Sequence, residues 1–158
     1  MQSKEKTNVM RILDKNKIEY ESFFYPADGE LTGTDVAEII GVETNRAFKT
    51  LITEGKSGAH YVFDIPVNCE LDLKKAAAAV GEKNVCMIKS KELLPLTGYV
   101  HGGCSPVGMK KFFRTTFDKS ATNGEHVCFS GGKLGVFLRV KLCDLQKIIK
   151  IGFADLTV

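Results

Sequence analysis

Two apolar stretches separated by a short polar segment constrain the fold of this chain more than any other feature. Residues 47–53 and 60–67 are rich in apolar side chains, and the connecting residues 54–59 contain two glycines and a serine. Apolar runs of this length, bounded by such residues, are typical of strands joined by a hairpin or a longer turn. We therefore expect two paired strands at the centre of a sheet.

Helix signals lie on both sides of this pair. Thr32 or Thr34 can cap the start of a short helix that ends at Gly41, since glycine readily adopts the left-handed conformation of a helix end. Asp72 and Gly81 have the same two roles around an alanine-rich segment. The predicted helices are 7–16, the short helix ending at Gly41, 73–80, a short helix from Ser90 to near Pro95, and 144–150.

Further strands are expected among these helices, at residues 18–25, 85–88, 112–117, 127–129 and 136–142. Strands and helices interleave irregularly, which fits a mixed sheet surrounded by helices better than a doubly wound parallel sheet. The predicted class is α+β, or mixed α/β. With 158 residues, of which 44% are apolar, the chain is expected to form one domain over 1–158.

Composition limits the classes of function. The formal charge of +3 is compatible with a polyanionic partner without requiring one, although Lys110, Lys111 and Arg114 form a local basic group. No stretch approaches the length of a membrane span, and the first 17 residues contain no apolar leader, so we expect a cytoplasmic protein without a membrane partner. The five cysteines include no C-x-x-C pair, and we expect reduced thiols that lie mostly in the core.

Two glycine-rich segments are candidates for ligand contact. Residues 102–108 read G-G-C-S-P-V-G, so their backbone could approach a ligand closely or could form a structural turn. Residues 130–135 read S-G-G-K-L-G and match neither the phosphate-loop pattern nor the dinucleotide fingerprint, which favours a hairpin turn.

Lys49 is the unusual residue of the first central strand, because strand alternation places it on the same face as Ala47 and Leu51. A half-buried ammonium is either an edge residue that reaches water or a functional cation that awaits a ligand. His101 and Cys104 do not have the spacing of zinc ligands. The sequence also contains no G-x-S-x-G nucleophile elbow and no recognisable order of catalytic-triad residues. An enzyme built on this chain would therefore work without a familiar triad and without a metal or other cofactor.

Several motifs occur together in a specific order, and they span nearly the whole chain. They are F-K-T-L at 48–51, L-D-L-K-K at 71–75, G-Y at 98–99, G-G-C-S-P-V-G-M-K-K at 102–111, S-G-G-K at 130–133 and F-A-D at 153–155. In this set the chain resembles the YbaK/EbsC family of aminoacyl-tRNA deacylases, which is related to the editing domain inserted in bacterial prolyl-tRNA synthetases.

The resemblance implies a mixed, partly barrel-like sheet with a pocket between the lysine strand and the loop 102–106. It implies a catalytic role for Lys49. The substrate-binding residues that it implies are Tyr25, Thr50, Gly102, Gly103, Ser105, Pro106 and Ser130. One position departs from the family, because several relatives carry an aspartate where this chain has Phe137.

The function implied is hydrolysis of mischarged aminoacyl-tRNA, most specifically Cys-tRNA(Pro) and Cys-tRNA(Cys), with the thiol of the substrate attacking its own ester. The expected partners are aminoacylated tRNA and, further, prolyl-tRNA synthetase. Two alternatives stay open at this point: removal of another small amino acid such as alanine from tRNA(Pro), and a non-catalytic module that binds tRNA or another nucleic acid. The sequence leaves open which tRNAs are served and the oligomeric state.

Overall fold

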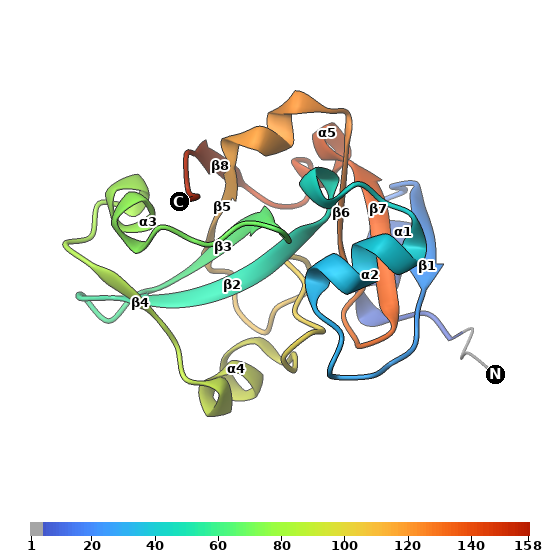
Figure 1. Ribbon diagram of the computed structural model, residues 1–158, viewed down its shortest axis with the longest axis horizontal. Coiled ribbons are helices and arrows are strands. Elements are labelled where there is room, and N and C mark those ends of the chain that lie inside the picture. The colour runs from blue at the N-terminus through green and yellow to red at the C-terminus, as the bar shows by residue number, and fades with distance from the viewer. Residues whose placement is uncertain (1–4) are drawn as a thin grey trace.

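The computed structural model describes residues 5–158, which form two β-sheets with helices around them (Figure 1). The three-stranded sheet has the order β1-β7-β6, and the five-stranded sheet has the order β4-β2-β3-β5-β8. The strands of the first sheet are β1 (Tyr20–Phe24), β6 (His126–Ser130) and β7 (Val136–Lys141). Those of the second are β2 (Phe48–Gly55), β3 (His60–Pro66), β4 (Val85–Met87), β5 (Arg114–Asp118) and β8 (Ile151–Ala154).

The central pair is the antiparallel hairpin β2-β3, as the sequence predicts, with Thr50 opposite Asp64. β4 is antiparallel to β2, whereas β3-β5 and β5-β8 are parallel, so the larger sheet is mixed. A single parallel bridge between Ala47 and Cys128 links β2 to β6 and joins the two sheets at that corner. The predicted α+β class is confirmed.

The helices begin and end mostly where the sequence indicates. They are α1 (Asn8–Lys15), α2 (Gly33–Ile40), α3 (Leu73–Val80), α4 (Ser90–Thr97) and α5 (Leu142–Leu145), with 3₁₀ turns η1 (Thr44–Arg46) and η2 (Lys119–Asn123). Thr32, not Thr34, caps α2 by accepting from the Asp35 amide. The Asp72 carboxylate caps α3, and α2 and α3 end at the left-handed glycines Gly41 and Gly81.

The helix predicted from Ser90 to near Pro95 is present, whereas another helix prediction was wrong in extent. α4 continues past Pro95 to Thr97, because the missing amide removes only one hydrogen bond from a short helix that Gly98 then closes. The predicted helix 144–150 is wrong, because the helical turn α5 ends at Leu145 and residues 146–149 form turns. The sequence analysis also missed the strand β8 that follows. β8 is stabilised by parallel pairing with β5, which lies over thirty residues earlier in the chain, and a local pattern does not report such pairing.

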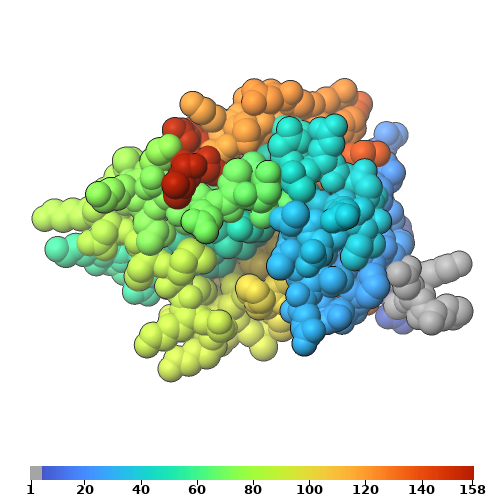
Figure 2. Space-filling model, viewed as in Figure 1, coloured from blue at the N-terminus to red at the C-terminus, as the bar shows by residue number. Residues whose placement is uncertain are grey.

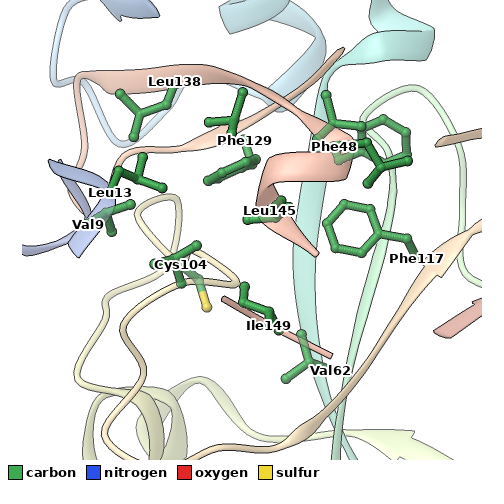
Figure 3. Close-up of a cluster of buried hydrophobic side chains, with 14 of the residues drawn as sticks. Val9, Leu13, Phe48, Val62, Cys104, Phe117, Phe129, Leu138, Leu145 and Ile149 are labelled. Atoms are coloured by element: carbon green, nitrogen blue, oxygen red, sulfur yellow. The ribbon is translucent and has the colours of Figure 1, made fainter. Parts of the chain in front are cut away.

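The main core lies between the two sheets (Figure 3). Phe48 from β2, Phe117 from β5, and Phe129 and Leu138 from the smaller sheet are almost fully buried there. Phe48 and Phe117 are in tilted ring contact, with centroids 5.6 Å apart. This contact fixes the start of β2, which carries Lys49 and Thr50.

All five cysteines are free, but the expectation that they lie mostly in the core was wrong. Cys104 and Cys128 are buried, whereas Cys86 and Cys143 are exposed and Cys69 is intermediate. None of the helices described in residues 5–158 combines the length and the apolar composition of a bilayer span. The expectation about an N-terminal leader falls partly on residues 1–4, outside the described residues.

Candidate active site

A cavity of about 380 Å³ opens where α2, the start of β2 and the loop before Cys104 meet the end of β6. Figure 2 faces this region, with the blue N-terminal segment on one side of the yellow glycine-rich loop and the yellow-green α4 on the other. The residues that line the cavity are Tyr25, Asp28, Gly29, Leu31, Thr32, Gly33, Val36, Phe48, Lys49, Thr50, Leu51, Val67, Leu93, His101, Gly102, Cys104, Ser130, Leu134 and Phe137. A mostly apolar lining with a few polar groups is typical of a small-ligand site.

Five of the eight residues proposed from the resemblance line this cavity, namely Tyr25, Lys49, Thr50, Gly102 and Ser130. Asp28, Thr32 and His101 also line it, although from the sequence Thr32 was considered only as a helix cap and His101 only as a metal ligand or partner of Cys104. No sequence pattern marks these three as site residues, because their place depends on how α2 and the loops fold back on β2.

The other three predicted residues do not line the cavity. Ser105 is fully buried, and its hydroxyl accepts a hydrogen bond from the Val107 amide at 3.3 Å, which closes a turn. Pro106 is buried and borders a separate hollow beside Ile12. Ser105 and Pro106 are therefore buried residues of the glycine-rich loop that pack away from the cavity.

Gly103 is also buried, and its place explains the paired glycines. A Cβ at Gly103 would lie 3.0 Å from the Cα of Lys133 and 3.2 Å from the amide nitrogen of Leu134. The two glycine-rich loops are thus in backbone contact at this point, and only a residue without a side chain fits there without displacement. Gly103 makes its close approach to the second loop rather than to the cavity.

Lys49 combines partial burial with the lack of a partner. Its side chain lies on the cavity, and among residues 5–158 it makes no hydrogen bond and no ion pair. A partly buried ammonium without an internal counter-ion leaves its interaction energy available for a ligand. Lys49 lies near the start of β2, where the strand borders the cavity. This position is compatible with both interpretations from the sequence, a strand-edge residue that reaches water and a functional cation that awaits a ligand.

The wall opposite β2 is aromatic. Tyr25 and Phe137 are both buried and meet edge to face, with centroids 6.4 Å apart. Burial raises the pKa of the Tyr25 phenol. Phe137, the position at which the resemblance leads us to expect an aspartate, therefore places a ring in the cavity wall.

Thr50 is connected to a carboxyl group that the sequence analysis did not single out. Its Oγ1 lies 2.5 Å from Oδ1 of Asp64 on β3, and Asp64 is fully buried. Burial raises the pKa of the Asp64 carboxyl to about 8. The signal that could have revealed Asp64 is the same as for Lys49: a single charged residue inside an apolar strand.

The one thiol on the cavity is unsuited to nucleophilic attack. Burial is the main cause that raises the pKa of Cys104 to about 12, so it stays a thiol near neutral pH. The Ser130 hydroxyl accepts a hydrogen bond from the Gly132 amide at 3.1 Å and has no basic side chain as partner within residues 5–158. The described cavity thus offers an unpaired cation and hydrogen-bonding groups, but no activated nucleophile.

Possible metal ligands lie elsewhere. Among residues 5–158, Glu54, His60 and Glu92 each place one potential ligand atom within 4.8 Å of the others, and none of the three lines the cavity. His60 Nε2 lies 3.2 Å from a Glu54 carboxylate oxygen, a contact that needs no metal. His101 and Cys104, which adjoin the cavity, belong to no such group.

A family model for an aminoacyl-tRNA editing domain matches residues 29–148, which contain Lys49, Thr50 and both glycine-rich loops. The chain belongs to this family, the YbaK/EbsC group of aminoacyl-tRNA editing proteins. Its activity is therefore aminoacyl-tRNA editing, the hydrolysis of an aminoacyl-tRNA ester, and aminoacylated tRNA is its substrate.

Individual proteins agree with this assignment. EbsC of Enterococcus faecalis, named as a candidate Cys-tRNA(Pro)/Cys-tRNA(Cys) deacylase, is 39% identical over 156 residues, covering 98% of this chain and 95% of that protein. A proline–tRNA ligase of Thermosipho melanesiensis is 35% identical over 78 residues, which are 49% of this chain and 14% of the ligase.

Solved structures share the fold at lower identity. A candidate trans-editing enzyme for prolyl-tRNA synthetase matches with a TM-score of 0.81 and 24% identity, over 98% of this chain and 99% of that one. The hypothetical protein APE2540 matches with a TM-score of 0.86 and 22% identity, over 96% of this chain and all of the other.

Proposed function

We propose that this chain hydrolyses cysteine esterified to tRNA(Pro), and also to tRNA(Cys), as a free-standing editing enzyme. The observation that carries the proposal is the combination of an unpaired Lys49 with a cavity whose own thiol, Cys104, is held protonated. Such a site can bind an aminoacyl ester and stabilise charge, but it lacks a protein nucleophile. The name of EbsC, which gives Cys-tRNA(Pro) and Cys-tRNA(Cys), supports the same substrates.

The chemistry we propose uses the substrate's own thiol. After the thiol loses its proton to water, its sulfur bonds to the ester carbonyl carbon, the C–O bond to the ribose breaks, and the departing ribose oxygen takes up a proton. Water then opens the resulting thiolactone and gives free cysteine. An aminoacyl ester is already activated, so positioning and stabilisation of the developing oxyanion supply what the protein must add.

Lys49 is proposed as the catalytic residue, with Tyr25, Thr50, Gly102 and Ser130 as substrate-binding residues. The ammonium of Lys49 would lie next to the ester or the acceptor end of the tRNA. Gly103, Ser105 and Pro106 would act by shaping the loop that carries Gly102. Prolyl-tRNA synthetase is proposed as a partner that delivers mischarged tRNA, and the sequence match to a proline–tRNA ligase supports this relation.

The test is a panel of tRNAs charged with cysteine, alanine, serine or proline, incubated with the protein and assayed for free amino acid. Preferential release of cysteine supports the proposal. Preferential release of alanine would assign the cavity to another small amino acid instead. Tight tRNA binding without release of any amino acid would favour the non-catalytic alternative.

A further inference from the structure

The strongest unassigned feature is the carboxyl group behind Thr50. Asp64 has no exposed surface, and its Oδ2 atom has no hydrogen-bond partner among the described residues, whereas its Oδ1 atom lies 2.5 Å from the hydroxyl of Thr50. Thr50 lines the cavity, but Asp64 does not. Among the described residues, the hydrogen bond with Thr50 is therefore the direct contact through which Asp64 can orient a group on the cavity.

A hydroxyl group has one hydrogen, so the protonation state of Asp64 decides what Thr50 can do. If Asp64 is ionised, it can only accept, and Thr50 must donate its hydrogen to Asp64 and face the cavity as an acceptor. If Asp64 is protonated, the carboxyl can donate to Thr50 Oγ1, and the hydrogen of Thr50 becomes free for the cavity. The two states give Thr50 opposite hydrogen-bonding roles.

The surroundings favour the protonated state. An ionised carboxylate with one oxygen buried and unpartnered would be costly, and burial raises the pKa of Asp64 to about 8. Across the sheet Asp64 pairs with Thr50 on β2 and with the apolar Phe117 on β5. The cation Lys49 is aligned with Ile65 instead. Burial and the charge of Asp64 raise the pKa of Cys104 on the glycine-rich loop to about 12, which keeps this thiol neutral over the same range.

We propose that Asp64 is a positioning residue: its protonated carboxyl donates to Oγ1 of Thr50, so that the Thr50 hydroxyl donates to the carbonyl oxygen of the bound ester. Donors aimed at an oxygen on which negative charge develops are an effective source of transition-state stabilisation. Lys49 and Thr50 are neighbours on β2 and both line the cavity, so a cation and a neutral donor would act from one strand. This inference rests on the proposed function of the cavity.

The first experiment compares Asp64→Asn with the wild type in single-turnover deacylation of Cys-tRNA(Pro) between pH 6.5 and 9, after subtraction of the enzyme-free rate. Asparagine offers an amide donor to Thr50 and cannot ionise, so the variant should stay within about fivefold of wild type at pH 7. Wild-type activity should fall about tenfold between pH 7 and 9 as Asp64 ionises, so the ratio of variant to wild type should rise by about that factor. Ionisations of the substrate cancel in this ratio.

Asp118→Asn is the matched control. Asp118 is also a buried aspartate, but both of its oxygens accept backbone hydrogen bonds, from Ser120 at 3.1 Å and from Leu156 at 2.9 Å, and it does not line the cavity. Its ratio to wild type should not rise with pH. A flat ratio for Asp64→Asn, or an equal rise for Asp118→Asn, would overturn the proposal.

A second pair of variants separates positioning from packing. Thr50→Ser keeps the hydroxyl and should retain most activity, whereas Thr50→Val should lose about 10²-fold. In the Thr50→Val background, adding Asp64→Asn should no longer change the pH profile. If the effect of Asp64→Asn persists without the Thr50 hydroxyl, Asp64 does not act through Thr50.

Two readouts need no deacylation. The side-chain carboxyl carbon of Asp64, assigned by its loss in Asp64→Asn, should titrate by NMR with a midpoint near pH 8, and a midpoint near 4 would refute the proposal. Because the folded pKa lies above the unfolded value, the wild type should lose stability relative to Asp64→Asn as pH rises from about 4 to about 8. A wild-type protein that releases no amino acid from any tRNA would refute the proposed function, while the NMR titration would still decide the state of Asp64.

Discussion

Two walls of the cavity, the strand wall of Lys49 and Thr50 on β2 and the loop wall of the glycine-rich loops, differ in how far the protein itself satisfies their polar groups. On the strand wall, Lys49 has no partner within residues 5–158, and Asp64 behind Thr50 leaves one oxygen unpaired. On the loop wall, formed by Gly102 and Ser130 of the two glycine-rich loops, the Ser130 hydroxyl accepts from the backbone amide two residues ahead. Ser105, buried behind this wall, does the same. The hydroxyl of Tyr99, beneath the same loop, donates to the Val107 carbonyl.

This difference assigns different tasks to the two walls. Groups that already bind within the protein gain little by turning to a ligand, so the loop wall gives shape. Groups that are desolvated but incompletely paired have interaction energy left for a ligand or a transition state. Changes at Lys49 should therefore affect catalysis more than stability, and changes at the buried loop residues that do not line the cavity should affect stability more than catalysis.

Lys49→Ala should have the largest effect. Removal of one well-placed electrostatic group from a desolvated site costs about 2.7–4 kcal/mol of transition-state stabilisation, so deacylation should fall roughly 10²–10³-fold. Lys49→Arg should rescue it poorly, because a planar guanidinium does not replace a compact ammonium. The measurement is single-turnover release of cysteine, with circular dichroism as the control for folding. A folded Lys49→Ala protein that works at the wild-type rate would remove the strand wall from the mechanism.

Much of the strand wall could be read from the sequence, because Lys49 interrupts an apolar strand and the flanking helices have recognisable caps. Thr32 with Gly41, and Asp72 with Gly81, are local signals, and the structure confirms both pairs. Asp64 carried the same signal as Lys49 but acquires its meaning only from the register that aligns it with Thr50. Register between strands is a long-range property, as is the pairing of β8 with β5.

The loop wall was harder to predict. The composition of 102–108 indicates a turn or a ligand contact, and the structure combines both, with Gly102 on the cavity and Gly103 against the backbone of Lys133. The pattern of glycines does not reveal that a second loop lies against the first. The prediction that the cysteines are mostly buried was wrong for a similar reason, because it depends on tertiary packing. Cys86, for example, is the middle residue of the short strand β4 and is exposed to solvent.

The next largest effect is expected from salt, which should weaken tRNA binding. It should act on a basic surface that lies outside the cavity. Lys110, Lys111 and Arg114 are exposed, and three neutralised phosphates would give tens of fold loss of affinity between about 50 and 200 mM salt. The double variant Lys110→Gln, Lys111→Gln should reduce the slope of log affinity against log salt concentration by about two. The rate at which bound substrate is deacylated should stay unchanged. An affinity that is independent of salt would exclude this surface.

Gly103→Ala tests the structural task of the loop wall. The added Cβ would press on the Lys133 backbone at 3.0 Å, so we expect a loss of about 1–3 kcal/mol in the free energy of unfolding. Gly29→Ala is the control for stability, because nothing lies within 4 Å of its Cβ. Chemical denaturation measures both. If Gly103→Ala abolishes deacylation at unchanged stability, the loop wall takes part in the chemistry.

Cys104→Ala should have the smallest effect, although this thiol is the group on the cavity that most resembles a nucleophile. Its pKa of about 12 leaves almost no thiolate near pH 7, and the proposed attacking sulfur belongs to the substrate. The variant removes one buried sulfur from the edge of the core, so a stability loss of about 1 kcal/mol is expected, with a deacylation rate within a few fold of wild type. Alkylation of the wild type with iodoacetamide should likewise modify the exposed Cys86 and Cys143 before Cys104, without loss of activity. Complete inactivation of a folded Cys104→Ala protein would instead place a protein thiolate in the reaction, and the division of tasks between the two walls would then be wrong.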